Sequence, residues 1–202
     1  MPKIKLFSGM DFSGKTTIIN GINNKIPSTF KIKKKFLTPI DLIENVRKMD
    51  TWLSPEEWKP LLQKNIQMDI DNYKEDGLVL LDSLWIIKYL AGKIEKGDKE
   101  DEEEICILKE LLKKYPQMDS FYITVSMEER IKRFYERSKL GEEITGSDKL
   151  IMDGKKFEER EKNYKKIVLE TFPNTKIIDT TNISLKETIE LIINDKNFVK
   201  DM

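Results

Sequence analysis

The chain has 202 residues and a formal net charge of zero, because 36 lysines and arginines balance 36 aspartates and glutamates. This length suits a single domain, and the balanced charge gives no reason to expect binding to nucleic acid or to a membrane surface. Histidine is absent, which excludes serine–histidine and cysteine–histidine catalysis and every histidine-ligated metal site.

The first predicted elements are a strand, a helix and a second strand. Residues 4–8 form a short apolar run before a glycine loop, which is typical of a buried strand. We expect a helix over residues 14–25, with Pro27 beyond its end. Residues 30–37 mix apolar side chains with lysines and predict a half-exposed strand.

The next elements are a long helix and the most apolar strand of the chain. The sequence Ser-Pro-Glu-Glu at residues 54–57 has the residue types of a helix start, and the helix is predicted to reach about residue 75. We expect a bend at Pro60, because proline lacks the N–H that a helix interior needs. Residues 77–82 read Gly-Leu-Val-Leu-Leu-Asp, and this unbroken apolarity predicts a strand that is covered on both faces.

The rest of the chain continues to alternate helices and strands. The further predicted elements are helices over residues 84–95 and 102–114, a strand over 121–125, a helix after Ser126, a helix over 157–172, a strand over 175–179 and a last helix after Ser184. Strands that alternate with helices imply crossover connections, so we expect an α/β domain whose parallel sheet is flanked by helices.

The cysteine content and the longest apolar runs indicate the compartment. The single cysteine, Cys106, lies in the apolar run of residues 105–108 and is expected to be a buried core thiol. The first residues lack the long apolar region of a signal peptide, and the longest apolar runs are far shorter than the roughly 20 residues that span a bilayer. We therefore expect a cytoplasmic protein.

Residues 9–16 carry the strongest functional signal. They read Gly-Met-Asp-Phe-Ser-Gly-Lys-Thr and match the phosphate-binding pattern G-x-x-x-x-G-K-[ST] at every fixed position. The motif follows a predicted strand and opens a predicted helix, where backbone N–H groups point at an anion. A simple glycine turn before a helix would not explain the lysine and the two threonines. The residues expected to bind ATP here are Gly9, Asp11, Phe12, Ser13, Gly14, Lys15, Thr16 and Thr17.

Three of the polar side chains are assigned to phosphate and metal chemistry. Lys15 is expected to contact the β- and γ-phosphates as a catalytic cation, and the Thr16 hydroxyl to bind Mg²⁺. Asp82 ends a predicted buried strand, at the sheet edge where ligands bind in open α/β folds, and its carboxylate can hold Mg²⁺ directly or through water. Asp82 could instead cap the helix that begins near residue 84, which requires the same location.

At these residues the chain resembles the thymidylate kinase group of P-loop nucleotide kinases, over nearly its whole length. Residues 11–17, Asp-Phe-Ser-Gly-Lys-Thr-Thr, are similar to that family's D-x-S-G-K-T-T loop, and residues 78–82 are similar to its strand before an Asp-Arg pair. Residues 129–137 look like its arginine-rich helix before the lid, residues 157–164 like its post-lid helix, and residues 179–182 like the loop beside adenine, with Thr181 as a cofactor contact.

The resemblance implies a fold and an activity. The fold is the three-layer P-loop NTPase fold, with a five-stranded parallel sheet flanked by helices, as one domain over residues 1–202 with a mobile lid at about residues 138–153. The activity is ATP-dependent phosphoryl transfer to a nucleoside monophosphate, with ATP and Mg²⁺ as cofactors, a small-molecule nucleotide as substrate, and a homodimer as the assembly.

The resemblance also suggests roles for two arginines. Arg133 would pack on adenine or support phosphate, and Arg137 would reach the transferring phosphoryl group as a catalytic cation. They lie four residues apart and so share one helix face, although surface ion pairs with neighbouring glutamates would explain each of them equally well. In some family members an arginine occupies the position of Phe12. Here the cation must come from the lid side, where Lys139 or Lys149 could substitute for Arg137.

Two departures from the family pattern fall on the acceptor side. The family's Glu-Pro pair after the second strand is Thr-Pro at residues 38–39 here, and its Asp-Arg pair after the third strand is Asp82-Ser83. The resemblance assigns both positions to the monophosphate acceptor, so the identity of the acceptor stays open. Lys88 or Arg47 could supply the missing cation.

Four residues are expected to contact the acceptor: Asp11, Gln63, Gln67 and Ser83. Asp11 would contact a sugar hydroxyl, and Gln63 and Gln67 could read a base edge as glutamines do in the related deoxynucleoside kinases, or simply face solvent. A kinase for another small acceptor and a nucleotide-binding protein without transferase activity remain alternatives. A GTPase switch is not favoured, because residues 82–85 and 24–27 lack its Asp-x-x-Gly and Asn-Lys-x-Asp patterns.

Overall fold

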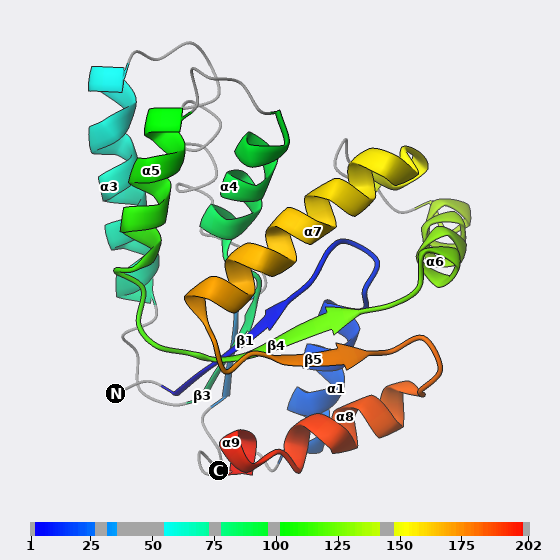
Figure 1. Cartoon of the computed structure of the whole chain (residues 1–202). Helices are drawn as coiled ribbons and strands as arrows, with labels where there is room; N and C mark the ends of the chain where they lie inside the picture. Colours follow the sequence, from blue (N-terminus) through cyan, green and yellow to red (C-terminus); the bar gives the residue numbers. More distant parts are fainter. Residues whose placement is uncertain are drawn as a thin grey trace.

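The computed structural model describes residues 3–26, 32–35, 55–72, 78–96, 102–141 and 148–199, and these form a parallel sheet between two layers of helices (Figure 1). The sheet has five strands in the order β2-β3-β1-β4-β5. The strands are β1 (Lys3–Ser8), β2 (Ile32–Lys35), β3 (Leu78–Asp82), β4 (Asp119–Thr124) and β5 (Lys176–Asp179). All four neighbouring pairs are parallel. The expected class of fold is confirmed.

Helices cover both faces of the sheet. The longer ones are α1 (Lys15–Lys25), α3 (Pro55–Asn72), α4 (Trp85–Lys96), α5 (Glu102–Leu112), α6 (Met127–Lys139), α7 (Gly154–Thr171) and α8 (Leu185–Ile193), and the shorter ones are η2 (Asp148–Met152) and α9 (Lys196–Val199). In Figure 1, α1, α8 and α9 lie on one side of the sheet, and α3, α4, α5 and α7 lie on the other.

The apolar strand β3 explains why both layers form. Successive side chains of a strand point to opposite faces. Val79 and Leu81 accordingly belong to the core under α4, α5 and α7, whereas Leu78 and Leu80 belong to the core under α1 and α8. All four are nearly inaccessible to solvent. The unbroken apolar run therefore serves two cores at once, as its sequence predicted.

The register brings the carboxyl ends of the strands to one edge. Phe7 pairs with Asp82, so β1 and β3 end side by side. Thr124 pairs with Asp179 in the same way at the ends of β4 and β5. Residues that follow β1, β3, β4 and β5 therefore meet at this edge, where ligands bind in open α/β sheets.

Side-chain caps begin two of the predicted helices. The Ser126 hydroxyl accepts a 3.3 Å hydrogen bond from the backbone N–H of Glu129 at the start of α6. At the start of α8, Ser184 and Glu187 form a reciprocal capping box. These caps confirm the two helix starts that were expected from the sequence.

The structure corrects the prediction for Cys106, which is exposed. Helix α5 buries Leu108, Leu111 and Leu112. Cys106 lies two residues before Leu108, about 200° away around the helix, so it faces solvent.

The short helix α9 was not predicted, and it is anchored by the fully buried Phe198. Ser54, Thr38, Pro39 and Arg47 lie outside the described residues. None of the described helices is both long and apolar enough to cross a membrane.

Candidate nucleotide-binding site

The loop between β1 and α1 has a backbone that requires glycine at two places. Gly9 has φ 142°, and a Cβ there would lie 2.3 Å from the carbonyl oxygen of Ile123 in β4. Gly14 has φ 91° and forms the N-cap of α1. Both conformations are rare for residues with a side chain. The loop therefore lies against β4 and curls around the N-terminus of α1, where backbone N–H groups bind anions.

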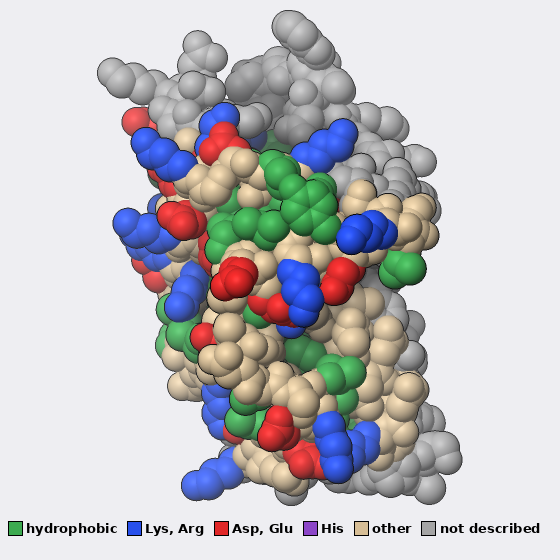
Figure 2. All heavy atoms as spheres, turned by 90° about the vertical axis from the view of Figure 1, so that its right-hand side faces the viewer, with side chains coloured by type: hydrophobic (Ala, Val, Ile, Leu, Met, Phe, Trp, Pro, Cys, Tyr) green, Lys and Arg blue, Asp and Glu red, His purple; other side chains and the backbone are tan. Residues whose placement is uncertain are grey.

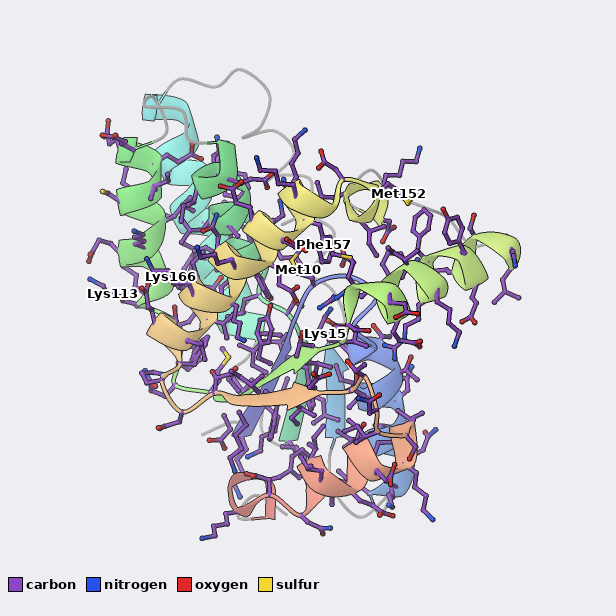
Figure 3. All side chains as sticks on the ribbon, turned by 45° about the vertical axis from the view of Figure 1, so that its right-hand side comes forward. Met10, Lys15, Lys113, Met152, Phe157 and Lys166 are labelled. Atoms are coloured by element: carbon purple, nitrogen blue, oxygen red, sulfur yellow. The ribbon has the colours of Figure 1, made fainter. Side chains whose placement is uncertain are left out.

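Lys15 is buried inside this loop. Its Nζ donates hydrogen bonds to the Met10 carbonyl oxygen at 3.0 Å and to Ser13 Oγ at 3.4 Å. Burial lowers the pKa of Lys15 to about 8, although the Asp82 carboxylate acts in the opposite direction. Figure 3 shows Lys15 at the carboxyl edge of the sheet, with Met10 and Phe157 nearby. An ammonium group held by neutral oxygens can exchange them for phosphate oxygens, which are the stronger acceptors.

Three oxygen-bearing side chains meet beside Lys15. The Thr16 hydroxyl donates a 2.7 Å hydrogen bond to Asp82 Oδ2, and the Ser83 hydroxyl donates to Asp82 Oδ1 at 3.2 Å. Adjacent ligands of an octahedral Mg²⁺ ion lie about 2.9 Å apart, since Mg–O bonds are about 2.0–2.1 Å long. The Thr16 and Asp82 oxygens therefore fit neighbouring positions on one Mg²⁺ ion.

This pair would not bind a metal ion by itself. Among the described residues, no group of three or more carboxylate or cysteine side chains comes together in a way that could hold a metal. Mg²⁺ sites in kinases are typically of this open kind, because phosphate oxygens and water complete the coordination. The donor set thus fits a metal ion that arrives with a nucleotide.

A pocket opens on the β5 side of the loop. Its volume is about 270 Å³. The lining residues are Ser13, Gly14, Thr17, Ile18, Arg133, Thr180, Ile183, Leu185 and Thr188. The lining combines apolar side chains with one guanidinium group and several hydroxyls, which suits a flat, partly polar group such as a nucleobase. Its contact with Gly14 and Thr17 places it next to the phosphate-binding loop.

Two arginines of α6 bind the carbonyl groups of the loop. Arg130 Nη1 donates to the Asp11 carbonyl oxygen at 2.9 Å, and Arg133 Nη1 donates to the Phe12 carbonyl oxygen at 3.1 Å. Arg130 is fully buried and pairs with Glu161 of α7 at 2.5 Å. Arg130 therefore links the loop, α6 and α7 from the interior of the protein. Arg133 also pairs with Glu129, and it faces the pocket.

Arg137 lies one turn further along α6, over an aromatic ring of the loop. Its guanidinium carbon is 5.8 Å from the centre of the Phe12 ring. Phe12 has φ 63°, which is unusual for a residue with a large side chain, and its ring packs edge-on against Phe134. Arg137 also makes a 3.7 Å ion pair with the nearly buried Asp148 of η2. The arginine is thus held beside the loop, between two partners.

Exposed apolar side chains accompany α6 and η2. Tyr135, Leu140 and Met152 each expose about half or more of their surface. Figure 2 looks at this side of the molecule and shows apolar side chains at the surface among charged ones.

Residues 142–147 of the expected lid lie outside the described part of the chain. Lys139 and Lys149, which sequence reasoning offered as substitutes for Arg137, are exposed.

The other side of the loop carries an ion pair between Lys88 of α4 and Asp11. Lys88 Nζ lies 3.3 Å from Asp11 Oδ1. Burial would raise the pKa of Asp11, but the ammonium groups of Lys88 and Lys15 hold it below its usual value. Ser83 follows β3 on the same side and has φ 66°. Both predicted acceptor residues next to the loop, Asp11 and Ser83, therefore lie opposite the pocket that contains Arg133.

Other predicted contacts lie further from the loop. The Thr181 hydroxyl donates to Asp179 Oδ1 at 2.6 Å and accepts from the backbone of Ser126 at 2.8 Å, while its neighbour Thr180 lines the pocket. Gln63 and Gln67 are exposed and line a different pocket, which includes Leu111 of α5 and no residue of the loop. The structure therefore does not bring these two glutamines to the nucleotide-binding loop.

Sequence reasoning missed most of the lining of the pocket beside Arg133. Thr180 and Ile183 come from the connection between β5 and α8, and Leu185 and Thr188 come from the first turns of α8. The resemblance marked residues 179–182 and gave Thr181 as the cofactor contact, whereas Thr180 is the residue of this loop that lines the pocket. The backbone N–H and the hydroxyl of Thr181 both donate hydrogen bonds to Asp179 Oδ1, so the Thr181 side chain is directed toward Asp179.

The chain has the fold of the P-loop nucleotide kinases. Among solved structures, the chain is similar to thymidylate kinase from Candida albicans, with 19% identity, a TM-score of 0.67, and coverage of 98% of this chain and 93% of that chain. It is also similar to deoxyadenosine kinase from M. mycoides, with 19% identity, a TM-score of 0.60, and coverage of 95% and 97%.

A third similar structure is thymidylate kinase from Ehrlichia chaffeensis, with 16% identity, a TM-score of 0.53, and coverage of 95% of this chain and 96% of that chain. No family model and no curated protein matches the sequence. At these identities the likeness concerns the fold, and the fold of the chain is thymidylate kinase-like.

Proposed function

We propose that the protein is a kinase that transfers the γ-phosphoryl group of ATP to a nucleoside monophosphate. The observation that carries this proposal is the position of the phosphate-binding loop between two unlike sites. A pocket with Arg133 lies on one side, and the charged pair of Asp11 and Lys88 lies on the other. A protein that only binds a nucleotide needs the first site alone, whereas a transferase needs both.

The donor nucleotide is bound by the loop and the neighbouring pocket. The base occupies the pocket beside Arg133, and the phosphates follow the loop to the N-terminus of α1. Lys15 leaves the carbonyl oxygen of Met10 and pairs with phosphate oxygens. Thr16 and Asp82 would hold Mg²⁺, which neutralises charge on the phosphate oxygens when it is bound.

Phosphoryl transfer depends mainly on positioning and on charge stabilisation, so the absence of histidine is no obstacle. An oxygen of the acceptor phosphate forms a bond to the γ-phosphorus as the bond from that phosphorus to the β–γ bridging oxygen breaks, and ADP leaves. Arg137 moves from the Phe12 ring to the phosphoryl group and stabilises the charge that shifts in this step.

The proposed function is tested with purified protein, ATP and Mg²⁺ against a panel of nucleosides and nucleoside monophosphates. We expect ADP to form only when an acceptor is present, together with the matching nucleoside diphosphate. ATP binding without transfer to any acceptor would contradict the proposal and favour a nucleotide-binding protein without transferase activity. Transfer to nucleosides alone would favour a nucleoside kinase, the class of the M. mycoides structure to which the chain is similar.

A further inference from the structure

A group of buried hydroxyls lies on the acceptor side of the loop, at the ends of β1 and β3. Tyr164 of α7 is fully buried, and its hydroxyl lies beside those of Ser8 and Ser83. Neither the Tyr164 hydroxyl nor the Ser8 hydroxyl makes a hydrogen bond of normal geometry to the described residues. Buried polar groups are nearly always hydrogen-bonded. The Tyr164 and Ser8 hydroxyls lie next to the proposed acceptor site, so their missing hydrogen bonds indicate that a polar partner interacts with these hydroxyls in the working enzyme.

Lys88 is the cation next to these hydroxyls. Its ammonium group pairs with Asp11 and lies in the neighbourhood of the Asp82 carboxylate and the uncharged Tyr164 hydroxyl. Burial alone would lower the pKa of Lys88, but the Asp11 carboxylate raises it, and the net shift is upward. Its side chain is 45% exposed, so a ligand can reach it. The acceptor side of the loop thus carries a cation that stays protonated and is accessible.

The other cationic side chains around the loop lie away from the acceptor side. Lys15 lies inside the loop, on the path of the donor phosphates. Arg130 is buried against Glu161, and Arg133 faces the donor pocket. Arg137 lies over Phe12 on the α6 side. Among the described residues around the loop, Lys88 is therefore the cation placed to meet an anionic group of the acceptor.

We propose that Lys88 holds the phosphate of the acceptor and that the hydroxyl of Tyr164 positions the lysine. This inference rests on the proposed function. The bound acceptor separates Lys88 from Asp11. The phosphate of the acceptor pairs with the ammonium group of Lys88, and a sugar hydroxyl of the acceptor donates a hydrogen bond to the Asp11 carboxylate. A nucleoside monophosphate offers both groups, whereas a nucleoside offers only the hydroxyl. The Lys88–Asp11 pair therefore selects for a phosphorylated acceptor.

The first test compares the kinetics of Lys88→Ala and Lys88→Arg with the wild type, using the best nucleoside monophosphate of the panel. A lost charge-assisted hydrogen bond weakens binding by roughly 10- to 100-fold. We expect the KM for the monophosphate to rise by this factor in Lys88→Ala, while the KM for ATP stays within about twofold. Lys88→Arg keeps the charge and should recover much of the loss.

Lys113→Ala is the matched control. Lys113 also pairs with a carboxylate, Glu110, and Figure 3 shows it just beyond the end of α5, away from Lys15. We expect both KM values of this variant to equal those of the wild type. An unchanged monophosphate KM in Lys88→Ala would overturn the inference while leaving the proposed function intact. A wild type that uses nucleosides as well as monophosphates would also overturn it.

Tyr164→Phe tests the positioning role separately. The variant keeps the ring and removes a buried hydroxyl that lacks a hydrogen bond, so we expect the melting temperature to stay the same or rise. The monophosphate KM should rise several-fold with the ATP KM unchanged. A lower melting temperature with an unchanged monophosphate KM would mean that the hydroxyl is only structural. If the wild type transfers no phosphoryl group at all, the proposed function fails, and this inference fails with it.

Discussion

The Thr16 hydroxyl donates a 2.7 Å hydrogen bond to the carboxylate of Asp82 and so joins the nucleotide-binding loop to the end of β3. If these two oxygens bind Mg²⁺, Asp82→Asn should raise the Mg²⁺ concentration for half-maximal turnover by at least about tenfold. The asparagine side chain has nearly the same shape as that of aspartate but lacks the negative charge that attracts the metal ion. A magnesium titration of turnover measures this. A lower melting temperature with an unaltered titration would mean that Asp82 has only a structural role.

Arg137 is expected to act in the transition state more than in ATP binding, because its guanidinium group lies over the Phe12 ring and pairs with Asp148 of η2. Arg137→Ala should lower the rate at saturating ATP and acceptor by about 100-fold or more, with a much smaller change in ATP affinity. Steady-state kinetics and a direct ATP-binding measurement separate the two. A weaker ATP affinity with the saturated rate preserved would contradict this role.

Gly9→Ala should destabilise the protein, because the added Cβ would lie 2.3 Å from the backbone of Ile123 and the residue has a positive φ. We expect a loss of about 2 kcal/mol or more in the free energy of unfolding. Gly92→Ala is the matched control, since Gly92 lies in α4 and the added carbon would meet no atom within 4 Å outside the neighbouring residues and backbone of its own helix. That change should be neutral or stabilise the helix by up to about 1 kcal/mol. Denaturant unfolding of both variants measures the difference, and equal effects would contradict it.

Arg130→Ala should be strongly destabilising. Arg130 is fully buried and bonds to Glu161, Val125 and the backbone of Asp11. Its removal leaves a carboxylate without its main partner, at a cost of about 3 kcal/mol or more. Lys132→Ala on the same helix removes an exposed ion pair and should cost less than about 1 kcal/mol. Similar losses in the two variants would mean that the Arg130 contacts contribute little to stability.

Local patterns predicted the parts of the structure that depend on local residues. The loop from Gly9 to Thr17 was identified because its glycines, lysine and threonines have fixed spacing. The parallel sheet followed from the alternation of elements, and β3 from its unbroken apolar run. Ser126 and Ser184 were recognised as caps for the same reason.

Features that depend on how distant elements pack were not predictable in this way. Cys106 has apolar neighbours on both sides in sequence, so only the packing of α5 decides that it faces solvent. Thr180 and Ile183 line the pocket beside Arg133 because the β5–α8 connection meets α1. The position of Tyr164 depends on how α7 crosses the ends of β1 and β3. Each of these follows from contacts between segments far apart in the sequence.

The most direct test of the whole account is the rate of ADP formation by Lys15→Ala, measured with ATP and Mg²⁺ in the presence and absence of the best acceptor. Lys15 is buried in the loop, and its ammonium group is expected to contact the phosphates in both the bound and the transition state. We expect the acceptor-dependent rate to fall by about 1,000-fold or more, with circular dichroism and the unfolding transition close to those of the wild type. A correctly folded Lys15→Ala variant with the turnover of the wild type would contradict the proposal that this loop carries phosphoryl transfer.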